Sequence, residues 1–188
     1  METVLILDFG AQYSQLIARR VREQNVYCEV KPCSISPDEI RELAPIGIIL
    51  SGGPQSVYES VSLHVDPALF SLGIPVLGIC YGCQLMAYSL GGTVAAATEA
   101  TAREYGKTLT EFDTESAIFH GLPASSVTWM SHGDYISQVP DGFTVTAKTA
   151  VCPTAAMACP EKKLYGVQFH PEVQHTVQGS EILRRFLY

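Results

Sequence analysis

The sequence predicts an α/β domain whose open, mostly parallel β-sheet carries helices on both faces, with antiparallel additions in the C-terminal half. In the first fifty residues, short apolar strand candidates alternate with amphipathic helix candidates through brief links. That alternation is typical of parallel strands joined by crossover helices. A further apolar run over residues 75–79 ends at Cys80 and leads into a helical stretch, and open α/β sheets place their sites at such strand ends.

The first ninety residues contain four strand candidates with helices between them. The first apolar run ends at Gly10, where a turn is easy, and the helix that follows has apolar residues on one face and arginines on the other. Ser36 is followed by a proline and two acids, which together signal a helix start. The strands are expected over 4–8, 27–30, 47–50 and 75–79, and the helices over 13–24, from 36 onward and over 84–90.

After Gly91 and Gly92 the pattern changes to short strand candidates separated by turn signals. These predict extensions of the sheet and antiparallel additions to it, followed by a closing helix. The strands are expected around residue 94 and over 105–112, 127–130, 143–147, 155–158 and 164–169, and the helix over 177–187. No repeat, low-complexity tract or linker divides the chain, so we expect residues 1–188 to form one domain.

Composition narrows the classes of function. The chain has 188 residues, 47% of them hydrophobic, which is enough for one sizeable core. Lys and Arg number 12 against 19 Asp and Glu, a net charge of −7 without a basic run, so nucleic-acid binding is not expected. The apolar runs are too short to span a bilayer, and the sequence after Met1 lacks the pattern of a signal peptide. We therefore expect a cytoplasmic protein that does not bind membranes.

Cys80 is the candidate nucleophile. A buried strand, a tight turn and a helix directly behind it form the layout of a nucleophile elbow. Gly78 and Gly82 lack a Cβ, so strand and helix can approach closely and the turn can adopt φ values that other residues resist. The positive end of the helix favours a thiolate over a thiol. The alternative is that Cys80 is a small core residue, as many free cysteines are.

The chain has six cysteines, and a strong core of this size needs no disulfide bonds. The spacing of Cys80 and Cys83 also matches a thiol-redox motif or half of a zinc site. A zinc site would need a second close pair, which the remaining spacings do not supply, so no metal is expected. The redox alternative stays open. The six are Cys28, Cys33, Cys80, Cys83, Cys152 and Cys159.

Two further motifs suit acyl transfer. His170 and Glu172 follow a strand candidate, and residues two apart in extended backbone project to the same face. Glu172 can therefore orient one ring nitrogen of His170 while the other takes a proton from a thiol. The turn Ser51-Gly52-Gly53-Pro54 also follows a strand, and its backbone N–H groups, with that of Tyr81, can point at a developing oxyanion.

Together these motifs resemble the class I, triad-type glutamine amidotransferases, which have a flavodoxin-like fold. The resemblance rests on Ser-Gly-Gly-Pro, on Gly-Ile-Cys-Tyr-Gly with Gln84, and on Phe-His-Pro-Glu. Further stretches over 7–13, 103–106, 129–134 and 166–173 resemble the glutaminase domains of glutamine-hydrolysing GMP synthetases, and the similarity extends over nearly the whole chain. Cys83 departs from the pattern, because the family usually has methionine there.

The resemblance implies a role for each matching position. Cys80 would be the nucleophile, His170 the general base and acid, and Glu172 the partner that orients His170. Gly53 and Tyr81 would form the oxyanion hole through their backbone N–H groups. The residues that the resemblance places in contact with the substrate are Gln84, Ser131, His132, Gly133 and Asp134.

The implied reaction is hydrolysis of the side-chain amide of L-glutamine through a γ-glutamyl thioester, giving glutamate and ammonia. The ammonia would pass to a synthetase (ATP-pyrophosphatase) domain that aminates XMP to GMP. ATP and magnesium would be needed only there, so no cofactor is expected in residues 1–188. Nothing in these residues resembles that domain or its phosphate-binding loop. The sequence leaves open whether the chain is an excised domain or a free-standing subunit.

Two alternatives remain. One is another cysteine-elbow enzyme, either a peptidase or an amidotransferase of a different pathway, and the implied glutamine contacts at Gln84 and over 131–134 disfavour the peptidase. The other is a thiol-redox module that uses Cys80 and Cys83 and would work without His170.

Overall fold

The computed structural model describes residues 2–10, 13–53, 64–96 and 104–188. Its strands are β1 (Thr3–Asp8), β2 (Tyr27–Pro32), β3 (Gly47–Leu50), β4 (Val76–Ile79), β5 (Thr93–Ala96), β6 (Glu104–Phe112), β7 (Ser125–His132), β8 (Asp134–Gln138), β9 (Thr144–Lys148), β10 (Ala156–Cys159) and β11 (Leu164–Val167). Its α-helices are α1 (Ser14–Glu23), α2 (Pro37–Leu43), α3 (Tyr81–Ser89) and α4 (Gly179–Leu187), and short 3₁₀ helices are η1 (Pro67–Ser71), η3 (Ala117–Phe119) and η4 (Pro160–Lys162).

Nine of these strands form a mixed sheet in the order β2-β1-β3-β4-β11-β10-β9-β6-β7. The five strands from β2 to β11 are parallel to one another, and the pairs from β11 to β7 are antiparallel. This confirms the predicted parallel sheet with antiparallel additions. One addition lies outside the sheet, because β5 pairs only with β8, in a separate two-stranded ribbon.

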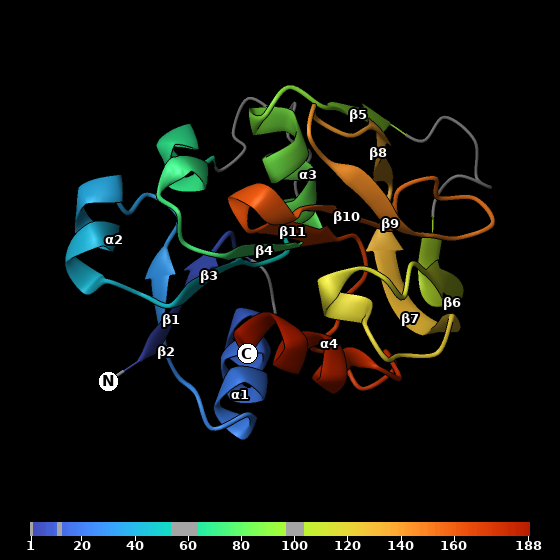
Figure 1. The fold of residues 1–188 in the computed structure, drawn as a ribbon, viewed down its shortest axis with the longest axis horizontal. Coiled ribbons are helices and arrows are strands. Elements are labelled where there is room, and N and C mark those ends of the chain that lie inside the picture. Colours follow the sequence, from blue (N-terminus) through green and yellow to red (C-terminus); the bar gives the residue numbers. More distant parts are fainter. Residues whose placement is uncertain (1, 11–12, 54–63, 97–103) are drawn as a thin grey trace.

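Helices cover both faces of the parallel part. Figure 1 shows α1 and α4 on one side of the sheet and α2 and α3 on the other. Strand β1 explains why both faces attract helices, since Val4 and Ile6 join one core cluster and Leu5 and Leu7 join the other. All four side chains are buried, so burial on both faces stabilises this interior strand.

The predicted elements are found within a few residues of their expected ends. In the N-terminal half, η1 was not predicted and α3 begins at Tyr81, three residues earlier than expected. The other differences lie in the C-terminal half. Strand β8 was not predicted, because only Ile136 within it is fully buried and the pattern around it is largely polar. Strand β11 ends at Val167, two residues earlier than expected, and α4 begins at Gly179 rather than at residue 177. Within the described ranges, no helix combines the length and apolar character needed to cross a bilayer.

Candidate active site

Cys80 lies between the end of β4 and the start of α3, as the elbow motif predicts. Its backbone has φ 53° and ψ −107°, in a region that residues with a Cβ rarely adopt, and its N–H donates to the carbonyl of Val167 at 2.8 Å. Such a conformation costs about 1–3 kcal/mol and persists only where the surroundings enforce it. We expected the unusual φ angle at the flanking glycines. It falls on Cys80 itself, which turns the sulfur out of the strand.

The two flanking glycines instead permit close packing. A Cβ on Gly78 would lie 2.7 Å from the carbonyl carbon of Gly82, and a Cβ on Gly82 would lie 2.5 Å from the carbonyl oxygen of Leu50. Real Cβ atoms do not approach backbone so closely. The first turn of α3 therefore lies directly on β3 and β4, and this holds Cys80 at the edge of the sheet.

His170 and Glu172 meet as predicted. The His170 Nδ1 atom and the Glu172 Oε1 atom are 2.7 Å apart, and both side chains are buried. The backbone around Pro171 and Glu172 is a turn rather than an extended strand, so the contact does not come from strand geometry. Distant residues hold the turn: Arg20 Nε donates to the carbonyl of Glu172 at 2.9 Å, and Thr176 Oγ1 donates to the carbonyl of His170 at 2.6 Å.

The surroundings of His170 favour its charged form. Burial lowers the pKa of this imidazole, but hydrogen bonds to Cys80 and to Glu172, with the charges of both groups, raise it to about 10. An ionised carboxylate only accepts hydrogen bonds, so the ring donates from Nδ1 to Glu172 and presents its other nitrogen to the sulfur. The arrangement favours an imidazolium beside the sulfur of Cys80.

The glycines after β3 lie against this pair. A Cβ on Gly52 would be 3.1 Å from His170 Cε1 and 3.6 Å from Cys80 Cβ, so only a glycine fits there without displacement. A Cβ on Gly53 would be 3.5 Å from the Tyr81 ring. The donor roles of the Gly53 and Tyr81 backbones stay predictions. Pro54 of the same motif and Arg103 of the 103–106 motif lie outside the described residues.

The segment over 131–134 also reaches Cys80. Cys80 Sγ lies 3.6 Å from the carbonyl oxygen of Ser131. The carbonyl of Asp134 accepts from Gln84 Nε2 at 3.1 Å and from His132 Nδ1 at 2.8 Å. The structure therefore brings the predicted substrate-contact segment close to Cys80, although its contacts with glutamine stay predictions. Gly133 lies nearby, where an added Cβ would be 3.5 Å from the Tyr105 hydroxyl.

Comparison with known proteins decides the family. Residues 5–188 match the family model of the class-I glutamine amidotransferases. The chain belongs to this family. It is 56% identical over 187 residues to a glutamine-hydrolyzing GMP synthase of Clostridium botulinum strain Alaska E43, and 57% identical over 187 residues to that of Caldanaerobacter subterraneus. Each alignment covers 100% of this chain and 36% of the relative, so the chain spans about a third of the length of these relatives.

Solved structures agree with this assignment. The crystal structure of a provisionally assigned GMP synthase subunit from Thermoplasma acidophilum matches with TM-score 0.89 and 32% identity, covering 100% of this chain and 92% of that one. A glutamine amidotransferase from Thermotoga maritima matches with TM-score 0.77 at 20% identity, covering 99% of this chain and 96% of that one, and supports the fold alone. The predicted fold class is confirmed.

Sequence reasoning missed one polar residue at the elbow of this amidotransferase. Gln168 is fully buried, and its Nε2 lies 3.6 Å from Cys80 Sγ while its Oε1 accepts from Gln84 Nε2 at 3.1 Å. A signal was present, because a glutamine that follows an apolar strand and precedes Phe-His-Pro-Glu is unusual for a core position.

Cys83 does not share the environment of Cys80 in this amidotransferase. It is 0% exposed and packs with the α2–α3 core, whereas Cys80 packs with the opposite core cluster. Burial, with the nearby Cys80 and Cys152 thiols, raises the pKa of the Cys83 thiol well above its ordinary value. A redox pair needs an accessible, readily ionised thiol, so this environment disfavours the redox alternative.

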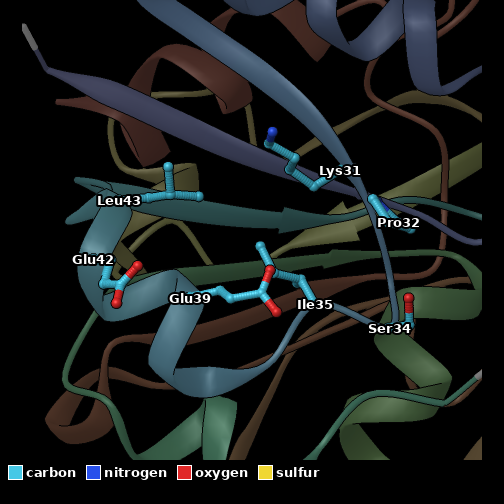
Figure 2. A pocket seen from close by; sticks show the side chains of 7 residues that line it. All are labelled: Lys31, Pro32, Ser34, Ile35, Glu39, Glu42 and Leu43. Carbon is cyan, nitrogen blue, oxygen red and sulfur yellow. The ribbon is translucent and has the colours of Figure 1, made fainter.

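The described residues hold no metal-ligand cluster, and one surface hollow on them is lined by residues outside the predicted site. Among them, no three His, Cys, Asp or Glu side chains gather so as to hold a metal ion. A surface hollow of about 470 Å³ lies between the C-terminal end of β2 and α2. Figure 2 shows its lining side chains, which include Lys31, Glu39 and Glu42. Strands β1 and β3 separate β2 from β4 in the sheet, and none of the predicted site residues lines this hollow.

Proposed function

We propose that this chain is the glutaminase of a GMP synthase: it hydrolyses the side-chain amide of L-glutamine and supplies ammonia for the amination of XMP to GMP. One observation carries the proposal. Cys80, on a strained elbow, faces a buried His170 that is bonded to Glu172, in a chain 56% identical to a glutamine-hydrolyzing GMP synthase. Nucleophile, base and orienting carboxylate are the groups that covalent acyl transfer requires.

The chemistry divides into two half-reactions. In the first, the Cys80 thiolate attacks the carbonyl carbon of the glutamine amide, and the backbone N–H groups of Gly53 and Tyr81 stabilise the oxyanion. His170 then protonates the leaving nitrogen, the C–N bond breaks, and ammonia departs from a γ-glutamyl thioester. In the second, His170 takes a proton from water, the hydroxide attacks the thioester, and the C–S bond breaks to release glutamate and restore the thiolate.

Substrate recognition is assigned to the residues around this centre. Gln84 and the segment over 131–134 lie beside Cys80, and they offer backbone carbonyls and buried polar groups to the amino-acid end of glutamine. Removal of one buried partner leaves the other unpaired and costs about 1–3 kcal/mol. We therefore expect a site of this kind to discriminate against asparagine, whose shorter side chain cannot reach both ends.

The acceptor reaction belongs to a separate part of the protein. The Clostridium botulinum relative is nearly three times as long as the segment aligned with this chain. The Thermoplasma acidophilum subunit, in contrast, is only slightly longer than this chain. The proposal therefore holds both for a fused domain and for a separate subunit. That residues 1–188 form a single glutaminase domain, with ATP and magnesium needed only by the synthetase part, stays a prediction. So does the cytoplasmic location.

The test is active-site labelling with an electrophilic glutamine analogue followed by peptide mass spectrometry. We expect one adduct, on the peptide that contains Cys80, with protection by L-glutamine and none by L-asparagine. The Cys83→Met variant is the matched control and should label as fast as the unaltered protein. Labelling on another cysteine, or labelling of Cys80 that glutamine does not prevent, would contradict the proposal.

A further inference from the structure

Gln168 lies beside Cys80 because of the register of two neighbouring strands. Strands β4 and β11 are parallel, and Ile79 pairs with Val167. The next residues along the two strands are Cys80 and Gln168, and the Cys80 N–H donates to the carbonyl of Val167 at 2.8 Å. Gln168 is itself anchored, since its N–H donates to the carbonyl of Ala155 at 2.7 Å. The backbone of Gln168 is therefore fixed beside Cys80, and its side chain is held by complete burial and by the bond to Gln84.

The direction of the amide hydrogen bonds follows from a backbone carbonyl. The Asp134 carbonyl only accepts, so the amide nitrogen of Gln84, at 3.1 Å, must face it. The same nitrogen donates to Gln168 Oε1 at 3.1 Å, which leaves the nitrogen of Gln168 facing Cys80 Sγ at 3.6 Å. Gln84 and Gln168 thus form an amide relay, in which one N–H of Gln84 donates to Gln168 and an N–H of Gln168 donates to the sulfur.

An anionic sulfur needs such a donor at this position. Cys80 is only 5% exposed, and a buried anion without hydrogen bonds is strongly disfavoured. The carbonyl oxygen of Ser131, 3.6 Å from Sγ, accepts from the neutral thiol and repels the thiolate. The Gln168 N–H acts in the opposite sense, because hydrogen bonds to ionised groups are the stronger ones and amides in a chain polarise one another.

We propose that Gln168, held in place by Gln84, is a positioning residue that stabilises the Cys80 thiolate and connects it to the 131–134 segment. The inference rests on the proposed function, since it assigns a further role within the same site. Both N–H bonds of the Gln84 amide go to protein acceptors, so any contact of this side chain with glutamine runs through its oxygen. Gln84 then contacts the substrate through its oxygen and is linked to the sulfur through Gln168.

The first test compares Gln168→Leu with the unaltered protein in the alkylation of Cys80 by iodoacetamide, without glutamine, followed by peptide mass spectrometry. We expect the rate at pH 7 to fall about 10- to 150-fold, the effect of one charge-assisted hydrogen bond. Because high pH ionises the thiol without help, the difference should shrink to about threefold or less at pH 9.5. In glutamate release, kcat should fall by a similar factor while KM changes by about threefold or less.

Matched variants separate this role from a loss of packing. Thr110→Val removes a buried hydroxyl that pairs with Thr128 at 2.7 Å, between β6 and β7, and should leave the alkylation profile and kcat unchanged. Gln168→Glu keeps the shape but replaces the donor with an oxygen, so it should be at least as slow as Gln168→Leu at pH 7. Cys80 of the double variant Gln84→Leu, Gln168→Leu should be alkylated no more slowly than that of Gln168→Leu alone, because both changes break the same relay.

The outcomes are distinct. An alkylation rate at pH 7 within about threefold of the unaltered protein, in Gln168→Leu or Gln168→Glu, would overturn the proposal, because one charge-assisted bond is worth about tenfold or more. So would an equal loss at pH 7 and pH 9.5, which indicates blocked access and not thiolate stabilisation. If Gln168→Leu fails to fold, the alkylation rates of Gln168→Glu at the two pH values test the proposal alone. Failure of the unaltered protein to release glutamate even with the synthetase part, ATP, magnesium and XMP present would refute the proposed function, and the alkylation comparison would still be readable.

Discussion

Glu172→Ala should impair the enzyme without abolishing it. The Glu172 carboxylate accepts from His170 Nδ1 at 2.7 Å, with the side chain 1% exposed, and its other oxygen, Oε2, is buried without a hydrogen-bond partner. The hydrogen bond to His170 is thus the only one that the Glu172 side chain makes among the described residues. The change leaves the nucleophile and the imidazole in place and removes the orientation and charge stabilisation of the ring.

The size of the effect follows from that bond. A hydrogen bond to a charged group contributes about 1.5–3 kcal/mol, which corresponds to a loss of about 10- to 150-fold in kcat/KM. The pH profile should change as well. Burial lowers the pKa of His170, whereas its hydrogen bonds to Cys80 and Glu172 and the charges of both groups raise the pKa to about 10. Without Glu172 the pKa falls.

The protonated ring must give its proton to the leaving ammonia, so activity declines as the pH rises through the pKa of His170. The alkaline limb of kcat/KM should lie near pH 10 in the unaltered protein and at lower pH in Glu172→Ala. Glutamate release measured from pH 6.5 to 10.5 gives both the loss in kcat/KM and the position of the alkaline limb, with Glu172→Gln as the isosteric control. A folded Glu172→Ala protein as inactive as Cys80→Ala, or an alkaline limb that does not move, would refute this assignment.

Four further predictions concern the elbow and its regulation. Cys80→Ala and His170→Ala should each reduce glutamate release to the assay background, because each removes a reacting group; turnover above background by either folded variant would contradict the triad. Cys83→Met should keep its activity in reducing buffer while losing about 1–3 kcal/mol in the free energy of unfolding, measured by urea titration, because the added atoms enter a filled core. Gly82→Ala should lower the melting temperature clearly more than the control Gly47→Ala, because the new Cβ would lie 2.5 Å from a β3 carbonyl in the first case and 3.5 Å from a phenylalanine ring in the second. The chain alone should release glutamate slowly and faster after stepwise addition of the synthetase part, ATP, magnesium and XMP, since a misplaced oxyanion donor costs about 10²–10³-fold; a full rate that no addition changes would exclude this coupling.

Local patterns in the sequence were sufficient for much of the fold and for the identity of the reacting groups. The alternation of strand and helix candidates predicted the parallel sheet, since each segment has a periodicity that depends only on its own residues. The same holds for the elbow, whose glycines and cysteine are adjacent in sequence. The contact between His170 and Glu172 was also predictable, although the backbone that makes it is a turn.

The tertiary structure decided what depends on distant residues. Arg20 supports the Glu172 turn across 152 positions, and Gln168 reaches Cys80 across 88. The β4–β11 register that creates the second contact leaves no trace in either strand alone, because each strand's side-chain pattern says which face is buried and not which neighbour it pairs with. The strained φ angle of Cys80 has the same origin, since packing of α3 on β3 and β4 imposes it. Local sequence was therefore enough to predict the candidate reacting residues, whereas the groups that hold and charge them depend on strand pairing and packing.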